Sequence, residues 1–146
     1  MLHYCKGDVY IKSVDIIYNP VGVTDNNNGF YSRLKKMYPD AYTLYKDFVH
    51  TTSKRECMGE IQIVPIAEKR VMLNGFCKTT SGYINKLALC KTLVELCNLA
   101  YEYKLSVGIE YALGKKDEVE RKLIKTIIHE VFHDVEIEVY LFNRDW

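Results

Sequence analysis

The sequence has no strong excess of charge of either sign. Its 146 residues include 20 Lys and Arg and 19 Asp and Glu, which gives a formal net charge of +1 at pH 7. A net field of one sign is what draws a protein to nucleic acid or to a membrane surface, so attraction of that kind is excluded. Twelve tyrosines could stack on bases. Most of them fall inside strand-like or helical patterns, which favours packing in the core.

Long apolar runs and paired cysteines are also missing. No stretch approaches the roughly 18 apolar residues of a membrane-spanning helix, and Met-Leu-His-Tyr-Cys-Lys does not resemble the start of a signal peptide. The five cysteines are odd in number and form no CxxC pair. This pattern excludes a secreted disulfide scaffold and a zinc ribbon. Two of the cysteines, Cys90 and Cys97, lie in a helix-like pattern, so we expect reduced thiols and a cytoplasmic protein.

Three common catalytic motifs are absent as well. There is no G-x-S-x-G, no P-loop and no G-x-G-x-x-G, so the usual signals for those chemistries are lacking. The zinc-peptidase motif H-E-x-x-H does occur, from His129 through Glu130 to His133. On a helix these histidines fall opposite the apolar face, and a following strand would carry Glu136 and Glu138 away from them. We therefore expect no metal and no cofactor, and keep a zinc peptidase only as a third hypothesis.

Short β-prone runs alternate with helical patterns along the chain. This alternation predicts an α/β layered sheet, and a chain of this length is the size of a single domain. The helix over Ile84–Tyr103 carries two apolar stripes at helical spacing. One runs through Leu87, Cys90, Val94, Cys97 and Tyr101, and the other through Leu89, Leu93, Leu96 and Ala100. The expected strands are Leu2–Lys6, Val14–Val21, Glu60–Ile66, Arg70–Phe76, Leu105–Tyr111 and Val135–Phe142. The other expected helices are Phe30–Phe48, broken at Pro39, and Asp117–His133.

Three loops follow strands in positions where α/β sheets bind ligands, outside the carboxyl ends of the strands. They are Gly7-Asp8, Gly22–Gly29 and Ala112–Asp117. The last loop brings a glycine and two lysines to a helix N-terminus, which is a suitable phosphate site. Asp117 can equally be a helix N-cap paired with Glu120, and Asp8 can equally be a turn residue. Both alternatives stay open at this point.

These loops, in this order, resemble the macro domain, the ADP-ribose-binding module. Lys6-Gly-Asp-Val9 is similar to the opening motif of that family, and Val14-Asp-Ile-Ile-Tyr-Asn19 to its next strand. Asn19-Pro-Val with Leu34-Lys-Lys-Met-Tyr-Pro39 resembles the branch that removes ADP-ribose from acidic protein side chains or from DNA. Gly59-Glu-Ile, Glu130-Val-Phe132 and Glu136–Tyr140 match later parts of the family pattern. The resemblance implies one macro-like domain over residues 1–146, a three-layer α/β/α sandwich with a mixed central sheet.

The resemblance also implies a role for individual residues. Asp8 would accept a hydrogen bond from the adenine amino group with the Val9 amide nearby, and Tyr140 or Phe142 would stack on the adenine. Lys78 would attack the anomeric carbon of the distal ribose and Asp117 would assist proton transfer, although Lys78 can also be an ordinary solvated lysine. The remaining implied ligand-binding residues are Asn19, Asn27, Asn28, Gly29, Gly114, Lys115 and Lys116.

The chain departs from the family pattern in its phosphate loops. The glycine-rich second loop is here Tyr111-Ala-Leu-Gly-Lys-Lys, the first loop reads Asn27-Asn-Gly29, and Arg121 replaces an aromatic residue. The expected function is binding of ADP-ribose or a close derivative, with hydrolysis of ADP-ribosyl linkages or of ADP-ribose phosphate. The alternative is a non-catalytic reader or sequestering module. The expected partners are ADP-ribose or an ADP-ribosylated macromolecule, with nucleic acid only as such a substrate and no membrane; the oligomeric state stays open.

Overall fold

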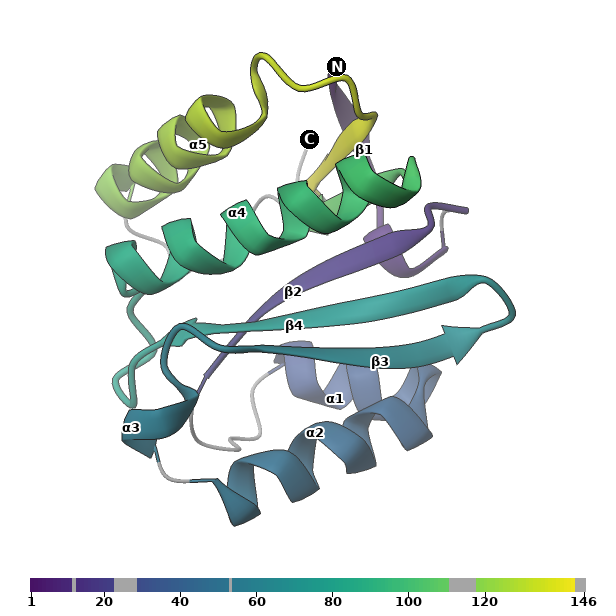
Figure 1. The fold of residues 1–146 in the computed structure, drawn as a ribbon. Coiled ribbons are helices and arrows are strands. Elements are labelled where there is room, and N and C mark those ends of the chain that lie inside the picture. The colour runs from purple at the N-terminus through teal and green to yellow at the C-terminus, as the bar shows by residue number, and fades with distance from the viewer. Residues whose placement is uncertain (12, 23–28, 53, 111–117, 144–146) are drawn as a thin grey trace.

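The computed structural model describes residues 1–11, 13–22, 29–52, 54–110 and 118–143. The strands are β1 Leu2–Lys6, β2 Ile16–Gly22, β3 Ile61–Ala67, β4 Arg70–Lys78, β5 Val107–Glu110 and β6 Val139–Asn143. The helices are the 3-10 turn η1 Val9–Ile11, α1 Gly29–Met37, α2 Pro39–Thr51, α3 Lys54–Cys57, α4 Lys86–Tyr103 and α5 Glu118–Phe132. Helices connect most of the successive strands, with three helices in a row between β2 and β3 and a direct hairpin from β3 to β4 (Figure 1).

The strands form one mixed sheet in the order β1-β6-β5-β2-β4-β3. All neighbouring pairs are parallel except β3 and β4, which form an antiparallel hairpin at one edge. Helices α4 and α5 cover one face of the sheet, and α1 and α2 cover the other (Figure 1). Two apolar clusters fill the spaces between the layers. The predicted three-layer α/β/α sandwich with a mixed central sheet is therefore confirmed.

Local sequence explains where the main elements begin and end. All seven residues of β2 are buried, as expected for a near-continuous apolar strand with helices on both faces. Pro39 opens α2 at the predicted break, because proline fits the first turn of a helix. The Asn85 side chain caps α4 by accepting from the Ala88 amide at 3.0 Å, and Lys104 ends the helix with a positive φ of 55°.

Two sequence predictions about these elements were wrong in detail. The last strand begins at Val139 rather than Val135, because the Ile137 amide donates back to the Val135 carbonyl at 2.9 Å and makes a tight turn after α5. In α4 only one apolar stripe is buried as a whole, the one through Leu89, Leu93, Leu96 and Ala100. In the other stripe Cys97 is buried, whereas Leu87, Val94 and Tyr101 are 81%, 46% and 61% exposed because they face away from the sheet.

Two further properties of the described residues bear on the class of protein. None of their helices is both long and apolar enough to cross a lipid bilayer. All five cysteines are free thiols, and Cys57, Cys77 and Cys97 are buried.

Candidate functional site

The candidate site lies at the edge of the sheet where the parallel strands end. Strands β2, β4 and β5 end there at Gly22, Lys78 and Glu110, and β1 leads into Gly7 and Asp8. Helices α1 and α5 begin at the same edge, because each follows a strand that ends there. Open α/β sheets bind their ligands at this edge. The described charged residues that meet here are Asp8, Arg33, Lys78, Glu110 and Glu120.

Arg33 is the most tightly held of these side chains. It extends from α1, and its Nη2 donates a hydrogen bond to Oε2 of Glu110 at 2.6 Å. Its Nε lies 3.7 Å from Oδ2 of Asp8, and its guanidinium carbon lies 4.8 Å from the centre of the Tyr10 ring. Burial tends to lower the pKa of Arg33, but Glu110 and Asp8 outweigh it and raise the pKa above its ordinary value. The guanidinium therefore stays charged between two carboxylates.

Asp8 has both a local and a longer-range role. Its Oδ1 accepts the Tyr10 backbone amide at 2.9 Å, so the turn predicted here forms and starts η1. Gly7 precedes it with a φ of +119°, a conformation that side-chain-bearing residues rarely adopt. The other carboxylate oxygen faces Arg33. Val9, predicted to lie beside an adenine, is fully buried, and its methyl group would sit 2.9 Å from a β-carbon added at Gly108.

Lys78 is the last residue of β4 and is partly buried. Burial lowers its pKa, while Cys77, Glu110 and Glu120 act in the opposite direction; the net pKa is below the ordinary lysine value. A lowered pKa increases the fraction of neutral, nucleophilic amine at a given pH. Glu110 thus acts on both cations of the site, Lys78 and Arg33. Glu120 approaches from the first turn of α5, and its Oε1 is buried without a hydrogen-bond partner among the described residues.

Asn19 belongs to a chain of side-chain amides that crosses three strands on the α1 and α2 face. The Tyr10 hydroxyl donates to Oδ1 of Asn19, and Nδ2 of Asn19 donates to Oδ1 of Asn74, both at 3.3 Å. Asn74 then donates to Gln62 at 3.1 Å, and Gln62 to the Leu44 carbonyl at 3.0 Å. Asn19 and Asn74 are both fully buried. We refer to this chain of four hydrogen bonds as the amide ladder. The contact between Asn19 and a ligand stays a prediction.

The two aromatic candidates occupy different environments on β6. Phe142 is 1% exposed and belongs to the core cluster beside Val9 and Val14. Tyr140 is half-buried and stacks on His3, with ring centres 4.7 Å apart and planes 18° apart. Both rings therefore already pack against protein, and stacking of either on an adenine stays a prediction.

The predicted loop residues Asn27, Asn28, Gly114, Lys115, Lys116 and Asp117 lie outside the described residues. Gly29 begins α1 at the site edge. Whether Asp117 and Lys78 converge in one cleft therefore stays a prediction.

Sequence reasoning did not single out Arg33, Glu110 or Tyr10, and treated Glu120 only as a capping partner. Arg33 stands in the run Ser-Arg-Leu-Lys-Lys, which looks like the solvated face of a helix. A signal did exist for Glu110: a carboxylate at the end of an apolar strand lies at the edge where ligands bind.

The two histidines of the H-E-x-x-H motif engage separate partners. Nε2 of His129 lies against the Tyr4 hydroxyl. Nε2 of His133 lies 2.8 Å from Asp134. No group of three or more possible metal ligands occurs among the residues that the structure describes.

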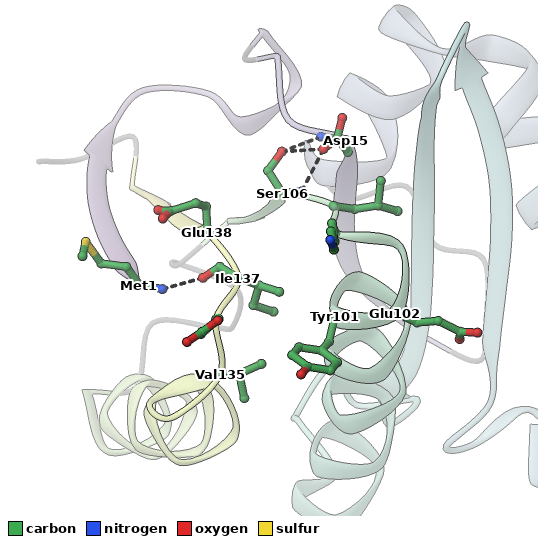
Figure 2. Close-up of a pocket in the computed structure, with 11 residues that line it drawn as sticks. Met1, Asp15, Tyr101, Glu102, Ser106, Val135, Ile137 and Glu138 are labelled. Atoms are coloured by element: carbon green, nitrogen blue, oxygen red, sulfur yellow. Dashed lines mark hydrogen bonds between the residues drawn. The ribbon is translucent and has the colours of Figure 1, made fainter.

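A hollow of about 850 Å³ lies at the opposite, amino edge of the sheet. Figure 2 shows it between the end of α4, which carries Tyr101, and the segment before β6, which carries Val135 and Ile137. Asp15 borders it and accepts hydrogen bonds from the Ser106 amide and hydroxyl at 2.8 and 3.0 Å. None of the described residues that line it was predicted as a site residue.

Comparison with known proteins identifies the fold. No protein-family model and no curated protein sequence matches the chain. The macrodomain of Thermus aquaticus DarG is 20% identical over 97% of both chains, with a TM-score of 0.79. A macrodomain protein from Streptomyces coelicolor is 16% identical over 97% of this chain and 98% of that one, with a TM-score of 0.81. Thermosipho africanus DarTG in complex with ADP-ribose is 16% identical over 97% of this chain and 41% of that one, with a TM-score of 0.75. The protein therefore has the macrodomain fold.

Proposed function

We propose that the protein binds ADP-ribose or a close derivative at the carboxyl edge of its sheet. The observation that carries this proposal is the cluster of Asp8, Arg33, Lys78 and Glu110 at that edge of a macrodomain fold. A cluster that holds both cations and carboxylates suits a ligand that carries phosphates together with amino and hydroxyl groups. The ADP-ribose complex of the Thermosipho africanus protein, which shares the fold, supports the choice of ligand.

We further propose that the bound ligand is hydrolysed through Lys78. The neutral amine attacks the anomeric carbon of the distal ribose, and the bond to the leaving oxygen breaks. A carboxylate carries the proton lost by the amine to that oxygen. Water then adds to the same carbon and releases Lys78. Glu110 and Glu120 act on Lys78 in the structure, and Asp117 is the carboxylate that the sequence resemblance implies. The reaction is hydrolysis of an ADP-ribosyl linkage or of ADP-ribose phosphate.

A non-catalytic reader is the second candidate function, and the pairing of Arg33 favours it. Glu110 is already held by Arg33 at 2.6 Å, which leaves it less free to move a proton. A reader would recognise an ADP-ribosylated protein or nucleic acid without cleaving it. For either function we propose that the chain acts as one domain in the cytoplasm, where its five free thiols stay reduced.

Calorimetric titration with ADP-ribose tests the binding step, with ATP and NAD as comparison ligands. We expect selective binding of ADP-ribose by the wild type and by Lys78→Ala. Lys86→Ala, which removes an exposed lysine from the start of α4, is the matched control. Absence of ADP-ribose binding in the wild type would end the proposal.

Single-turnover assays on ADP-ribosylated protein, ADP-ribosylated DNA and ADP-ribose phosphate test the hydrolysis step. We expect Lys78→Ala to reduce the rate by about 10²- to 10⁴-fold, the range for a lost proton-transfer or nucleophilic group. Lys86→Ala should retain the wild-type rate. Binding without turnover of any of the three substrates would establish the reader instead.

A further inference from the structure

The hollow at the amino edge of the sheet continues into a second hollow beside it. The first has a volume of about 850 Å³ and the second of about 480 Å³, and Tyr101, Val135 and Glu136 line both. Together they form one groove between the end of α4 and the segment that joins α5 to β6 (Figure 2). We refer to it as the amino-edge groove. The proposed function leaves it unused, because the candidate site lies at the opposite ends of the strands.

The segment that joins α5 to β6 alternates between acidic and apolar residues. Val135 is half-buried and Ile137 is buried, whereas Asp134, Glu136 and Glu138 are exposed. In Figure 2 the side chains of Val135 and Ile137 extend towards α4. This wall of the groove therefore has an apolar base and an acidic rim.

Tyr101 gives the opposite wall an exposed aromatic surface. It projects from α4 towards the segment that carries Val135, and more than half of its side chain is exposed (Figure 2). The half-buried Leu105 lines the groove beside it. Aromatic side chains that contribute to hollows of this kind are frequent anchors of protein–protein interfaces. The two walls together favour an occupant with apolar side chains.

The carboxylates of the larger hollow outnumber its cations. Its charged lining residues are Asp15, Glu102, Glu136 and Glu138 on one side of the balance and Lys104 and the terminal amine of Met1 on the other. Glu136 forms no ion pair with any residue that the structure describes, and neither does Glu102. Glu102 extends away from Tyr101 in Figure 2, so we assign the main charge contact to Glu136. A concave surface with this balance attracts cations.

We propose that the amino-edge groove binds a segment of a partner protein in which Lys or Arg residues alternate with apolar residues. The apolar side chains pack on Tyr101 and Val135, and the cations pair with Glu136 at the rim. Nucleic acid and anionic lipid surfaces do not fit, because the carboxylates repel them. The proposal does not rest on the proposed function, since the two sites lie at opposite edges of the sheet.

Selection from a phage library of random peptides tests the class of partner. The library is first depleted on the immobilised double variant Glu136→Lys/Tyr101→Ala and then selected on the wild type. We expect the enriched peptides to carry a net positive charge and to alternate Lys or Arg with apolar residues. Failure of the wild type to enrich any peptide, or enrichment of acidic or uncharged peptides, would overturn the proposal.

Fluorescence polarisation with the most enriched peptide then tests the individual contacts. We expect Glu136→Lys and Tyr101→Ala each to weaken binding by at least about tenfold, the effect of losing one interface anchor. Asp47→Lys makes the same charge change on α2, which covers the other face of the sheet, and Tyr83→Ala removes another exposed tyrosine. Both controls should bind as tightly as the wild type. Undiminished binding by the two groove variants would place the peptide elsewhere and overturn the proposal.

A second copy of this chain is the alternative occupant, and sedimentation of the wild type over a range of concentrations tests it. A dimer that Tyr101→Ala converts to a monomer would assign the groove to self-association instead. A monomer at every concentration, together with peptide binding, supports the partner segment. Circular dichroism melting checks that both groove variants are folded, as expected because Glu136 and Tyr101 are exposed. None of these measurements uses ADP-ribose, so their outcome is separate from that of the proposed function.

Discussion

Tyr18 and Gly75 meet across neighbouring strands with no room for another carbon atom. A β-carbon added at Gly75 would lie 2.6 Å from the Tyr18 hydroxyl and 2.9 Å from Oγ1 of Thr92. The hydroxyls of Tyr18 and Thr92 are themselves 2.7 Å apart and buried between β2, β4 and α4. The glycine is therefore required by close packing of a buried polar pair.

We predict that Gly75→Ala destabilises the protein by about 1–3 kcal/mol, the usual cost of forcing an extra carbon into a packed core. Urea unfolding followed by circular dichroism measures the change. Tyr18→Phe removes the nearest atom of the clash, so the double variant should lose less than the sum of the two single changes. Strict additivity would show that the Tyr18 hydroxyl is not what the alanine meets.

Cysteine reactivity should follow burial. Burial raises the pKa of Cys77 to about 12, although Lys78 and the Tyr18 hydroxyl act against it. Alkylation requires the thiolate, so Cys77 should resist iodoacetamide at pH 8 in the folded protein. The half-exposed Cys5 and Cys90 should react first. Mass spectrometry of timed digests gives the order. Alkylation of Cys77 as fast as Cys5 would contradict the described packing, and labelling in urea provides the control for intrinsic reactivity.

Lys78 should make stability depend on pH in the alkaline range. In the folded protein its pKa is below the ordinary lysine value of about 10.4. At pH values between the folded-state pKa and the ordinary value, the unfolded chain therefore binds more protons than the folded protein. The cost of burying the charge is present in full below the folded-state pKa. It is relieved as the pH rises from there to the ordinary value.

We therefore predict that the stability of the wild type rises relative to Lys78→Met as the pH is raised towards 10. Chemical denaturation at a series of pH values measures both proteins. Lys86→Met should follow the wild-type pH dependence within about 0.5 kcal/mol, as expected of a surface change. A constant difference between wild type and Lys78→Met would mean that the Lys78 amine is not desolvated.

Removing Glu110 should leave Arg33 without its strongest partner. Both side chains are under one-fifth exposed, at 13% for Glu110 and 15% for Arg33, so solvent screens the pair only weakly. We predict that Glu110→Ala costs about 1–3 kcal/mol, the range for losing a charged hydrogen bond while its partner stays partly buried. Thermal and urea unfolding measure the loss. Glu68→Ala, in the exposed turn between β3 and β4, should change stability by less than about 0.5 kcal/mol. Equal effects of the two substitutions would show that the pair adds nothing.

Much of the fold could be predicted because the apolar residues that become buried recur at regular spacings in the sequence. The continuous apolar run of β2 and the Leu89 to Ala100 stripe of α4 are read directly from residue spacing. The exposed Leu87, Val94 and Tyr101 repeat with the same helical period, so spacing cannot separate them from core residues. Only the placement of α5 and the sheet decides which side of α4 is covered.

The sequence predicted where the candidate site lies better than it predicted which residues form it. Lys78 ends β4 and Asp8 lies two residues after the end of β1, so topology brings them to one edge. Arg33 reaches Glu110 across 77 positions of sequence, and no local pattern encodes such a pairing. Its helix reads as solvated because three of its neighbours in sequence are polar.

The amide ladder permits only one register between β2 and β4. Side chains alternate between the two faces of a strand, so sliding β2 by one residue against β4 would move Asn19 to the α4 face. The slid strand would bury the Asn19 amide among aliphatic side chains and leave Asn74 and the Tyr10 hydroxyl without their hydrogen bonds to Asn19. Such misaligned forms are thereby disfavoured during folding, so the strand ends that carry Gly22 and Lys78 emerge side by side in a single arrangement.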